Sequence, residues 1–132
     1  TYKALMDGME STKNNTRMTL HLALNYSSRW EIIEATKKIA VLAKEEKLDP
    51  NNVDETEFDK HLATAGIPDP ELLIRTSGER RLSNYLLYQL AYTELYFTDN
   101  YWPEFRKVDF YKALIDFQMR ERRFGMTSDQ IG

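Results

Sequence analysis

The segment from 74 to 84 gathers the side chains of this chain that are best suited to bind phosphate. It reads Ile-Arg-Thr-Ser-Gly-Glu-Arg-Arg-Leu-Ser-Asn and holds three arginines, Arg75, Arg80 and Arg81. Arginine guanidinium groups bind phosphate oxygens through paired hydrogen bonds. Ser83 stands where a following helix would begin, and the N–H groups at a helix N-terminus favour an anion. These residue types predict a diphosphate cradle; a solvated loop with surface arginines is the alternative.

Two other places could do chemistry, and each has a plainer explanation. Glu94 begins an apolar run, so it is either a metal ligand or the partner of a nearby arginine. Residues 25–29, Asn-Tyr-Ser-Ser-Arg, join a predicted strand to a predicted helix, where either a binding site or simple capping by Ser28 is expected. Histidines and carboxylates form no cluster at ligand spacing around His21 or His61, so we interpret both histidines as structural.

The hydrophobic pattern predicts the elements that would position these residues. Residues 18–24 alternate apolar side chains with others and predict a strand. Ser28 with Glu31, and Asp54 with Glu57, are typical capping boxes at helix starts. Short apolar runs predict strands at 72–74 and 95–97, and helices are expected at 2–9, at 83–92 and from Asp109 onward. Strands that alternate with helices predict an α/β fold with a mostly parallel sheet, and three strands are few enough that we expect more upstream.

Composition excludes several classes of function. The chain has 132 residues and a net charge of -3, so it has no basic field that would attract nucleic acid, and we expect no nucleic-acid partner. It has no cysteine, which excludes disulfides, thiolate metal sites and a cysteine nucleophile and favours a reducing, cytoplasmic location. The sequence contains no apolar run of membrane-spanning length.

An ordered series of motifs resembles the cis-prenyltransferase family, in particular the undecaprenyl diphosphate synthases. The segments that carry the resemblance are 24–32 with its Asn-Tyr-x-x-Arg, the arginine segment 73–87, the Ala-Tyr-Thr-Glu-Leu-Tyr-Phe of 91–97, Trp102-Pro103 and the ending 120–125. The resemblance as a whole covers the chain from about Met18 to Gly125. Ser27 and Ser28 depart from the family, which often has glycines there.

The resemblance implies a Rossmann-like sheet flanked by helices, assembled as a homodimer, and a role for individual residues. Arg75, Arg81 and Ser83 would hold the diphosphate of isopentenyl diphosphate, and Glu94 would help to place Mg2+. The residues that would support this site are Asn25, Arg29, Gly78, Glu79 and Asn84. The residues that would complete the partner subunit's site are Arg123 and Gly125.

The implied reaction condenses isopentenyl diphosphate with an allylic diphosphate, farnesyl diphosphate above all, and repeats to give the undecaprenyl diphosphate carrier lipid of cell-wall peptidoglycan synthesis. The enzyme would be cytoplasmic, with peripheral membrane contact through its lipid product. The family's catalytic aspartate has no match here, because Met6-Asp7-Gly8 is followed by unrelated letters and lies too close to Asn25. Residues 1–132 are therefore predicted to be a C-terminal fragment of the catalytic domain, inactive alone.

Two other functions are alternatives to this one. A non-catalytic partner subunit of a heteromeric cis-prenyltransferase is the main alternative, but such subunits lose much of the substrate loop, and Arg75, Arg81, Ser83 and Glu94 are all present here. A nucleotide-binding or RNA-binding α/β domain would need a glycine-rich phosphate loop or a basic stripe, and the sequence has neither.

Overall fold

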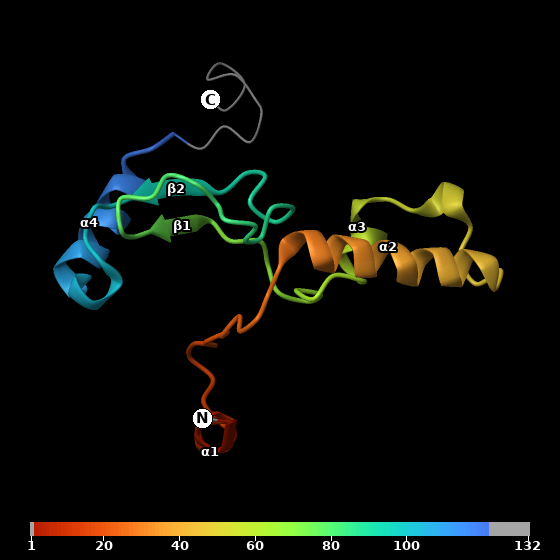
Figure 1. Cartoon of the computed structure of the whole chain (residues 1–132), viewed down its shortest axis with the longest axis horizontal. Coiled ribbons are helices and arrows are strands. Elements are labelled where there is room, and N and C mark those ends of the chain that lie inside the picture. The colour runs from red at the N-terminus through yellow and green to blue at the C-terminus, as the bar shows by residue number, and fades with distance from the viewer. Residues whose placement is uncertain (1, 122–132) are drawn as a thin grey trace.

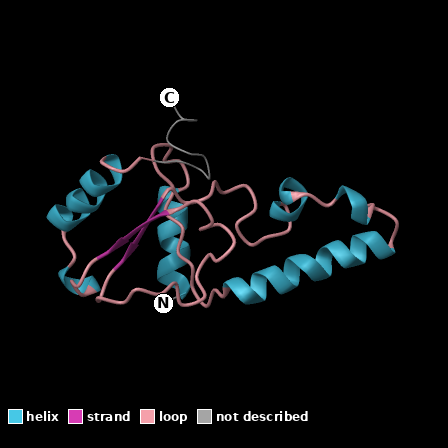
Figure 2. Ribbon diagram, turned by 90° about the horizontal axis from the view of Figure 1, so that it is seen from above, coloured by secondary structure: helices cyan, strands magenta, loops and turns pink. Residues whose placement is uncertain are grey.

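The sheet consists of two short parallel strands. The computed structural model describes residues 2–121. Strand β1 spans Leu72–Arg75 and strand β2 spans Glu94–Phe97, with Leu72 opposite Glu94 and Arg75 opposite Phe97. Helix α4, Lys107–Gln118, packs against β2 (Figure 2). Both strands form where continuous apolar runs predicted them, and a parallel sheet with flanking helices confirms the predicted α/β class.

The remaining helices lie away from the sheet. Helix α2, Ser28–Lys44, and the short helix α3, Glu55–Asp59, lie together on one side of the chain, whereas the sheet and α4 lie on the other (Figure 1). Helix α1, Tyr2–Thr12, stands apart at the end of an extended segment (Figure 1). Two 3-10 turns, η1 at Pro50–Asn52 and η2 at Trp102–Glu104, complete the described elements. Within residues 2–121, no helix is both long and apolar enough to cross a membrane.

The two predicted capping boxes have different outcomes. Asp54 caps α3 as expected, because its side chain accepts a hydrogen bond from Glu57 N at 2.8 Å. The prediction for Ser28 and Glu31 is wrong: Ser28 is already the first residue of α2, and its hydroxyl accepts from Leu87 N at 2.9 Å. The start of α2 is capped from a distant part of the chain instead.

Two predicted elements do not form. Residues 18–24 are an extended segment without strand pairing, and Met18 and Leu24 are 81% and 67% exposed, because no neighbouring strand within 2–121 supplies hydrogen-bond partners. Residues 83–92 form successive turns instead of a helix. Ser83, Asn84 and Leu86 have φ angles of 51°, 60° and 45°, in the left-handed region, which a right-handed helix cannot accommodate.

The core is small for a chain of this size. Four hydrophobic residues are buried among those described, namely Ala35, Leu62, Leu90 and Ala113. The accessible surface is 10884 Å², whereas the size scaling of folded monomers gives about 7200 Å² for 15.6 kDa. The chain therefore leaves much apolar surface in contact with water, most visibly along the extended segment.

Candidate functional site

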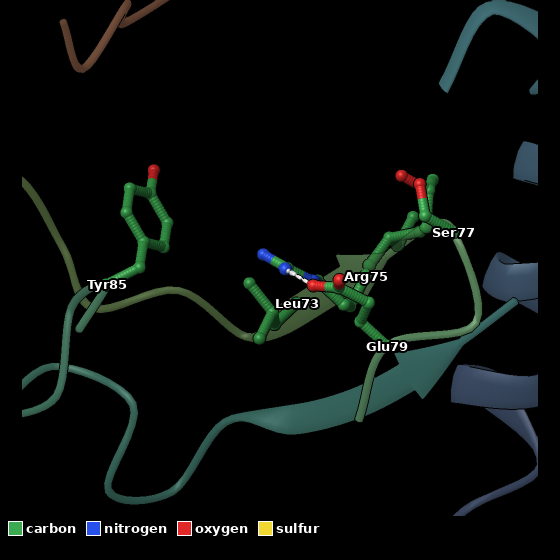
Figure 3. A pocket seen from close by; sticks show the side chains of 7 residues that line it. Leu73, Arg75, Ser77, Glu79 and Tyr85 are labelled. Carbon is green, nitrogen blue, oxygen red and sulfur yellow. Dashed lines mark hydrogen bonds and ion pairs between the residues drawn. The ribbon is translucent and has the colours of Figure 1, made fainter. Parts of the chain in front are cut away.

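A cavity of about 490 Å³ opens beside the C-terminal end of β1. Its lining consists of residues 73–77 together with Glu79 and Tyr85 (Figure 3). In an open α/β sheet this is the expected place for a ligand, because the strands end there and their loops diverge. The segment 74–84, which was predicted to bind phosphate, therefore borders a cavity.

A tight turn after β1 fixes the backbone at this cavity. Ser77 and Gly78 both have positive φ angles, 70° and 68°, and their N–H groups donate to the carbonyls of Asn100 and Thr98 at 2.8 and 2.9 Å. A Cβ at Gly78 would lie 3.2 Å from Asp99 Oδ1 in a conformation that side chains rarely adopt. Gly78 thus serves the turn, and the turn sets where Arg75 and Glu79 begin.

One carboxylate joins the two arginines that were predicted to bind diphosphate. Arg75 Nη2 donates to Glu79 Oε2, and Arg81 Nη2 donates to Glu79 Oε1 at 2.6 Å. The hydrogen bond from Arg75, above all, lowers the pKa of Glu79 below its usual value, and the nearby charge of Arg81 adds to this. Two guanidinium groups on one carboxylate leave one formal positive charge at the cavity.

Ser83 lies near this group in a way that the sequence did not indicate. Its Oγ is 3.4 Å from Arg75 Nη2, so the three predicted binding residues do converge, but as part of a turn. The expectation that Ser83 caps a helix is wrong, because no helix follows it. The side chain of Arg80 is exposed, on the same loop.

Asn84 links the arginine loop to the start of α2. Its carbonyl accepts from Ser28 N at 2.9 Å, its Oδ1 accepts from Arg29 N at 2.9 Å, and its Nδ2 donates to Ser27 Oγ at 2.7 Å. These bonds satisfy the first N–H groups of the helix, which have no partners within it. The two segments that the motif series treated separately, 25–29 and 73–87, are therefore one structural unit. Asn25 is exposed and has a φ of 55° in the bend before α2.

Sequence reasoning missed a buried polar network beneath this unit. Glu31 is 1% exposed and accepts hydrogen bonds from Tyr26 Oη, Ala63 N at 3.0 Å and Gln89 Nε2 at 2.9 Å. Gln89 Nε2 also donates to Thr64 Oγ1 at 2.8 Å. The sequence contained one indication of this network, namely a glutamate on the apolar side of a predicted helix. We interpreted that glutamate, Glu31, as part of a capping box instead.

Tyr26 connects this network to the cavity wall. Burial, and then the hydrogen bond to Glu31, raise the pKa of Tyr26 to about 12. Its ring meets the ring of Tyr85 edge to face, with centroids 5.6 Å apart and an angle of 81° between the planes. Tyr85 lines the cavity, so two tyrosines connect Glu31 to the cavity lining.

Glu94 lies at the other end of the sheet. It begins β2 opposite Leu72, whereas Arg75 ends β1, three residues further along; at about 3.3 Å per residue this is roughly 10 Å along the strands. Glu94 Oε2 accepts from Arg120 Nη1 at 2.8 Å, and Arg120 Nη2 lies 2.6 Å from Asp116 Oδ2. Of the two interpretations left open for Glu94, the structure shows the arginine partner.

This arrangement bears on the expected Mg2+. Residues 2–121 contain no cluster of three or more histidine, cysteine, aspartate or glutamate side chains that could hold a metal ion. Magnesium often uses one or two carboxylates together with substrate phosphates, but Glu94 does not border the cavity of Arg75. Among residues 2–121 of one chain, the donors do not fit a magnesium ion that touches both Glu94 and a diphosphate at Arg75. Arg123 and Gly125 lie outside the described residues.

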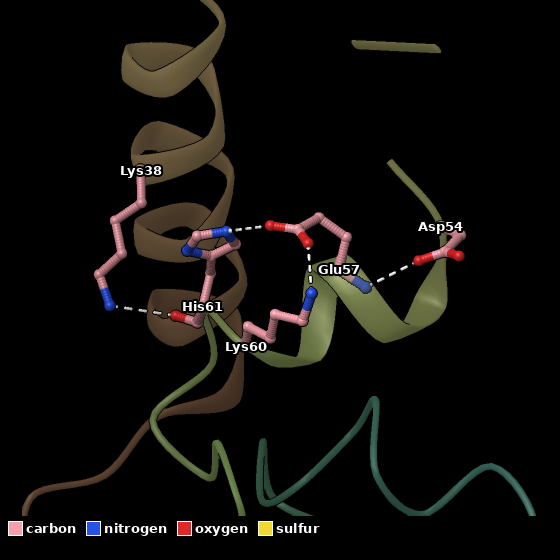
Figure 4. A network of polar contacts seen from close by, with 5 residues as sticks. All are labelled: Lys38, Asp54, Glu57, Lys60 and His61. Carbon is pink, nitrogen blue, oxygen red and sulfur yellow. Dashed lines mark hydrogen bonds and ion pairs between the residues drawn. The ribbon is translucent and has the colours of Figure 1, made fainter. Parts of the chain in front are cut away.

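The two histidines lie away from the cavity. His61 Nε2 is 3.1 Å from Glu57 Oε1, and Lys60 Nζ donates to Glu57 Oε2 at 2.6 Å (Figure 4). The bond from Lys60, followed by that from His61, lowers the pKa of Glu57. Lys38 Nζ donates to the His61 carbonyl at 3.0 Å, which ties α2 to the end of α3. His21 lies exposed in the extended segment.

The parallel sheet with flanking helices belongs to the α/β class, in which ligands bind beyond the carboxyl ends of the strands. The comparisons with known proteins narrow that class. The model of the family described as "Putative undecaprenyl diphosphate synthase" matches residues 1–125, and the chain belongs to this family. The resemblance seen in the motif series is thereby confirmed.

Individual relatives agree with the family match. The isoprenyl transferase of Chlorobaculum tepidum is 48% identical over 98% of this chain and 49% of its own length. The tritrans,polycis-undecaprenyl-diphosphate synthase (geranylgeranyl-diphosphate specific) of Methanocaldococcus jannaschii is 49% identical over 93% of this chain and 45% of its own length. The chain therefore spans about half the length of the curated relatives it matches.

A solved structure supports the fold. Lavandulyl diphosphate synthase from Lavandula x intermedia, in complex with dimethylallyl diphosphate, has a TM-score of 0.87 and 40% sequence identity. The match covers 94% of this chain and 53% of that chain. The similarity thus extends over nearly the whole of this chain and about half of the solved one.

Proposed function

We propose that this chain is the C-terminal part of a cis-prenyltransferase and supplies its isopentenyl diphosphate site. The observation that carries the proposal is the convergence of Arg75 and Arg81 on one carboxylate beside a cavity at the end of β1. A diphosphate bears several charges and paired oxygens, which suit two guanidinium groups better than a single carboxylate does. The full-length protein would condense isopentenyl diphosphate with an allylic diphosphate, with pyrophosphate as the leaving group.

Each residue of the unit has a proposed role in holding the substrate. Arg75 and Arg81 neutralise the diphosphate, and Ser83 Oγ adds a donor beside Arg75. Gly78 permits the turn that holds Arg75 in place, while Asn84 fixes the loop against α2. Charge neutralisation of this kind brings two anionic substrates close enough to react. These roles concern binding and orientation, and the acid or base of the reaction would come from outside these residues.

Several finer features belong to the same proposal and rest on the family resemblance. The protein would form a homodimer in which Arg123 and Gly125 complete the partner subunit's site. Its allylic substrate would be farnesyl diphosphate, and its product the undecaprenyl carrier used in peptidoglycan synthesis, made in the cytoplasm at the membrane surface. The family resemblance also implies Mg2+ with Glu94 as its ligand, but Glu94 pairs with Arg120 in this structure, and no step of the proposal depends on the metal.

Substrate binding to single-site variants tests the proposal. Arg75→Ala in the full-length protein should raise the dissociation constant for isopentenyl diphosphate roughly 10- to 150-fold, because a charge-assisted contact is lost. Arg80→Ala is the matched control, since Arg80 is on the same loop but exposed, and it should change affinity less than about twofold. Equal effects of the two variants would show that the cavity is not the binding site.

The alternative of a non-catalytic partner subunit makes a different prediction. Such a subunit would not need an intact substrate site, so Arg75→Ala would leave polyprenyl synthesis by the assembled enzyme unchanged. Radiolabelled isopentenyl diphosphate incorporation distinguishes the two functions. Residues 1–132 alone should give no product, because no residue among them matches the family's catalytic aspartate; robust product would contradict their assignment as a fragment.

A further inference from the structure

Glu79 occupies the arginines where a diphosphate would bind. Its two oxygens each take one guanidinium group, Oε2 from Arg75 and Oε1 from Arg81. Figure 3 shows the carboxylate of Glu79 directly against the guanidinium of Arg75 within the cavity lining. A ligand that pairs with both arginines therefore meets a competitor that belongs to the protein.

The backbone beneath Glu79 is fixed, whereas its side chain is not enclosed. The preceding turn is held by the hydrogen bonds of Ser77 and Gly78 to the 98–100 segment. The Glu79 side chain is 35% exposed and the Arg81 side chain is 67% exposed. The Glu79 carboxylate can thus rotate into water while the backbone of the turn, and the start of both arginine side chains, stay in place.

We propose that Glu79 is an internal counter-ion that holds Arg75 and Arg81 until a diphosphate displaces it, and that it sets the affinity of this site. The proposal rests on the proposed function, because it takes the arginine cavity to be the diphosphate site. In physical terms, the ligand binds only when the carboxylate is released, so the apparent dissociation constant is the intrinsic one divided by the released fraction. When no ligand is bound, the Glu79 carboxylate also reduces the electrostatic repulsion between the two arginines.

Removal of the carboxylate charge tests this displacement. In the full-length protein, Glu79→Gln should tighten isopentenyl diphosphate binding by roughly 2- to 20-fold, as measured by isothermal titration calorimetry, since partly exposed ion pairs hold only modestly. Glu79→Asp keeps the charge and should tighten binding less than Glu79→Gln does. Glu104→Gln removes the same charge from an exposed position on η2 and should leave affinity within about twofold of the original protein. Glu79→Ala is a second neutral variant, and it should tighten binding even if the glutamine variant does not fold.

Opposite results overturn the proposal in distinguishable ways. If the neutral variants bind isopentenyl diphosphate as weakly as the original protein or more weakly, Glu79 stays with the arginines in the complex and orients them instead. If Glu79→Gln tightens binding equally when Arg75 and Arg81 are both alanine, the gain does not pass through the arginines. If Arg75→Ala leaves affinity unchanged with Glu79 present, the ligand binds elsewhere, and the proposed diphosphate site fails together with this inference.

Discussion

The two ends of the strand pair carry opposite versions of the same ion-pair cluster. At the carboxyl end of β1, one carboxylate, Glu79, holds two arginines. At the start of β2, one arginine, Arg120, holds two carboxylates, Glu94 and Asp116. The first cluster has one surplus positive charge and borders a cavity, whereas the second has one surplus negative charge and fixes α4 to β2.

This difference shows why arginine and glutamate motifs cannot be assigned a function by residue type alone. The Arg75–Glu79 pair and the Arg120–Glu94 pair are both only partly exposed. What separates them is the balance of charge and the presence of a hollow for a ligand. The comparison predicts that substitutions at the Arg75 end change ligand affinity, while those at the Arg120 end change stability.

The strongest test combines both arginines of the cavity. Arg75→Ala with Arg81→Ala should raise the dissociation constant for isopentenyl diphosphate by about 100-fold or more, because two charge-assisted contacts are lost. Arg120→Ala should change it less than about twofold. Calorimetric titration of the full-length variants measures both. A large loss of affinity in Arg120→Ala would break the division between the two ends.

Glu31 is a buried carboxylate that accepts hydrogen bonds from three neutral donors, and its removal should cost the most stability. Glu31→Ala leaves the donors of Tyr26, Ala63 and Gln89 without their acceptor in a buried site. We expect the free energy of unfolding to fall by about 3–5 kcal/mol, as for other buried groups whose partner is deleted. Denaturant unfolding of the full-length protein measures it, with Glu34→Ala, a partly exposed carboxylate on the same helix, as a control. Similar losses for both variants would mean that the network contributes little.

The Arg120 end should contribute less. Arg120→Ala and Glu94→Gln should each lower the free energy of unfolding by about 1 kcal/mol, since partly exposed ion pairs are weak. Glu94→Gln should also leave the Mg2+ concentration for half-maximal incorporation within about twofold, because Glu94 is engaged by Arg120. An increase of tenfold or more in that concentration would instead establish Glu94 as the metal ligand that the family resemblance implies.

The parts of the fold that depend on local pattern could be predicted from the sequence. The continuous apolar runs gave both strands, and Asp54 capped α3 as its spacing required. The prediction of a strand at 18–24 was wrong, because alternating apolar residues form a strand only when a neighbouring strand is present to pair with them. The prediction of a helix at 83–92 was also wrong. The backbone groups of Asn84 and Leu87 form hydrogen bonds with the start of α2. Ser83, Asn84 and Leu86 accordingly have left-handed conformations, which a helix does not allow.

The proximity of the site residues could be predicted from the sequence, but their contacts could not. Arg75, Arg81 and Ser83 lie together because they follow a strand that was itself predictable, and their role in binding diphosphate stays a prediction. That Glu79 bridges the arginines, and that Glu94 faces Arg120 instead, depends on side-chain contacts across the chain. Nothing in the spacing of those residues distinguishes a carboxylate that competes with a ligand from one that binds a metal.

The smallest expected effect concerns Tyr26, which couples the cavity end to the buried network. Because burial and Glu31 raise its pKa to about 12, the folded protein binds the phenol proton more tightly than the unfolded chain, whose value is about 10. The stability gained from this preference is present below pH 10 and is lost as the pH rises from about 10 to 12. The ultraviolet absorbance difference between the original protein and Tyr26→Phe should therefore show tyrosinate forming with a midpoint near 12. Tyr26→Phe removes the hydrogen bond to Glu31, and the ring of residue 26 contacts Tyr85 in the cavity lining. The affinity for isopentenyl diphosphate should therefore be slightly weaker in Tyr26→Phe, while the ion pairs of Arg120 should be unchanged. A midpoint near 10 would show that Tyr26 is not held by Glu31, and that the network does not support the cavity wall.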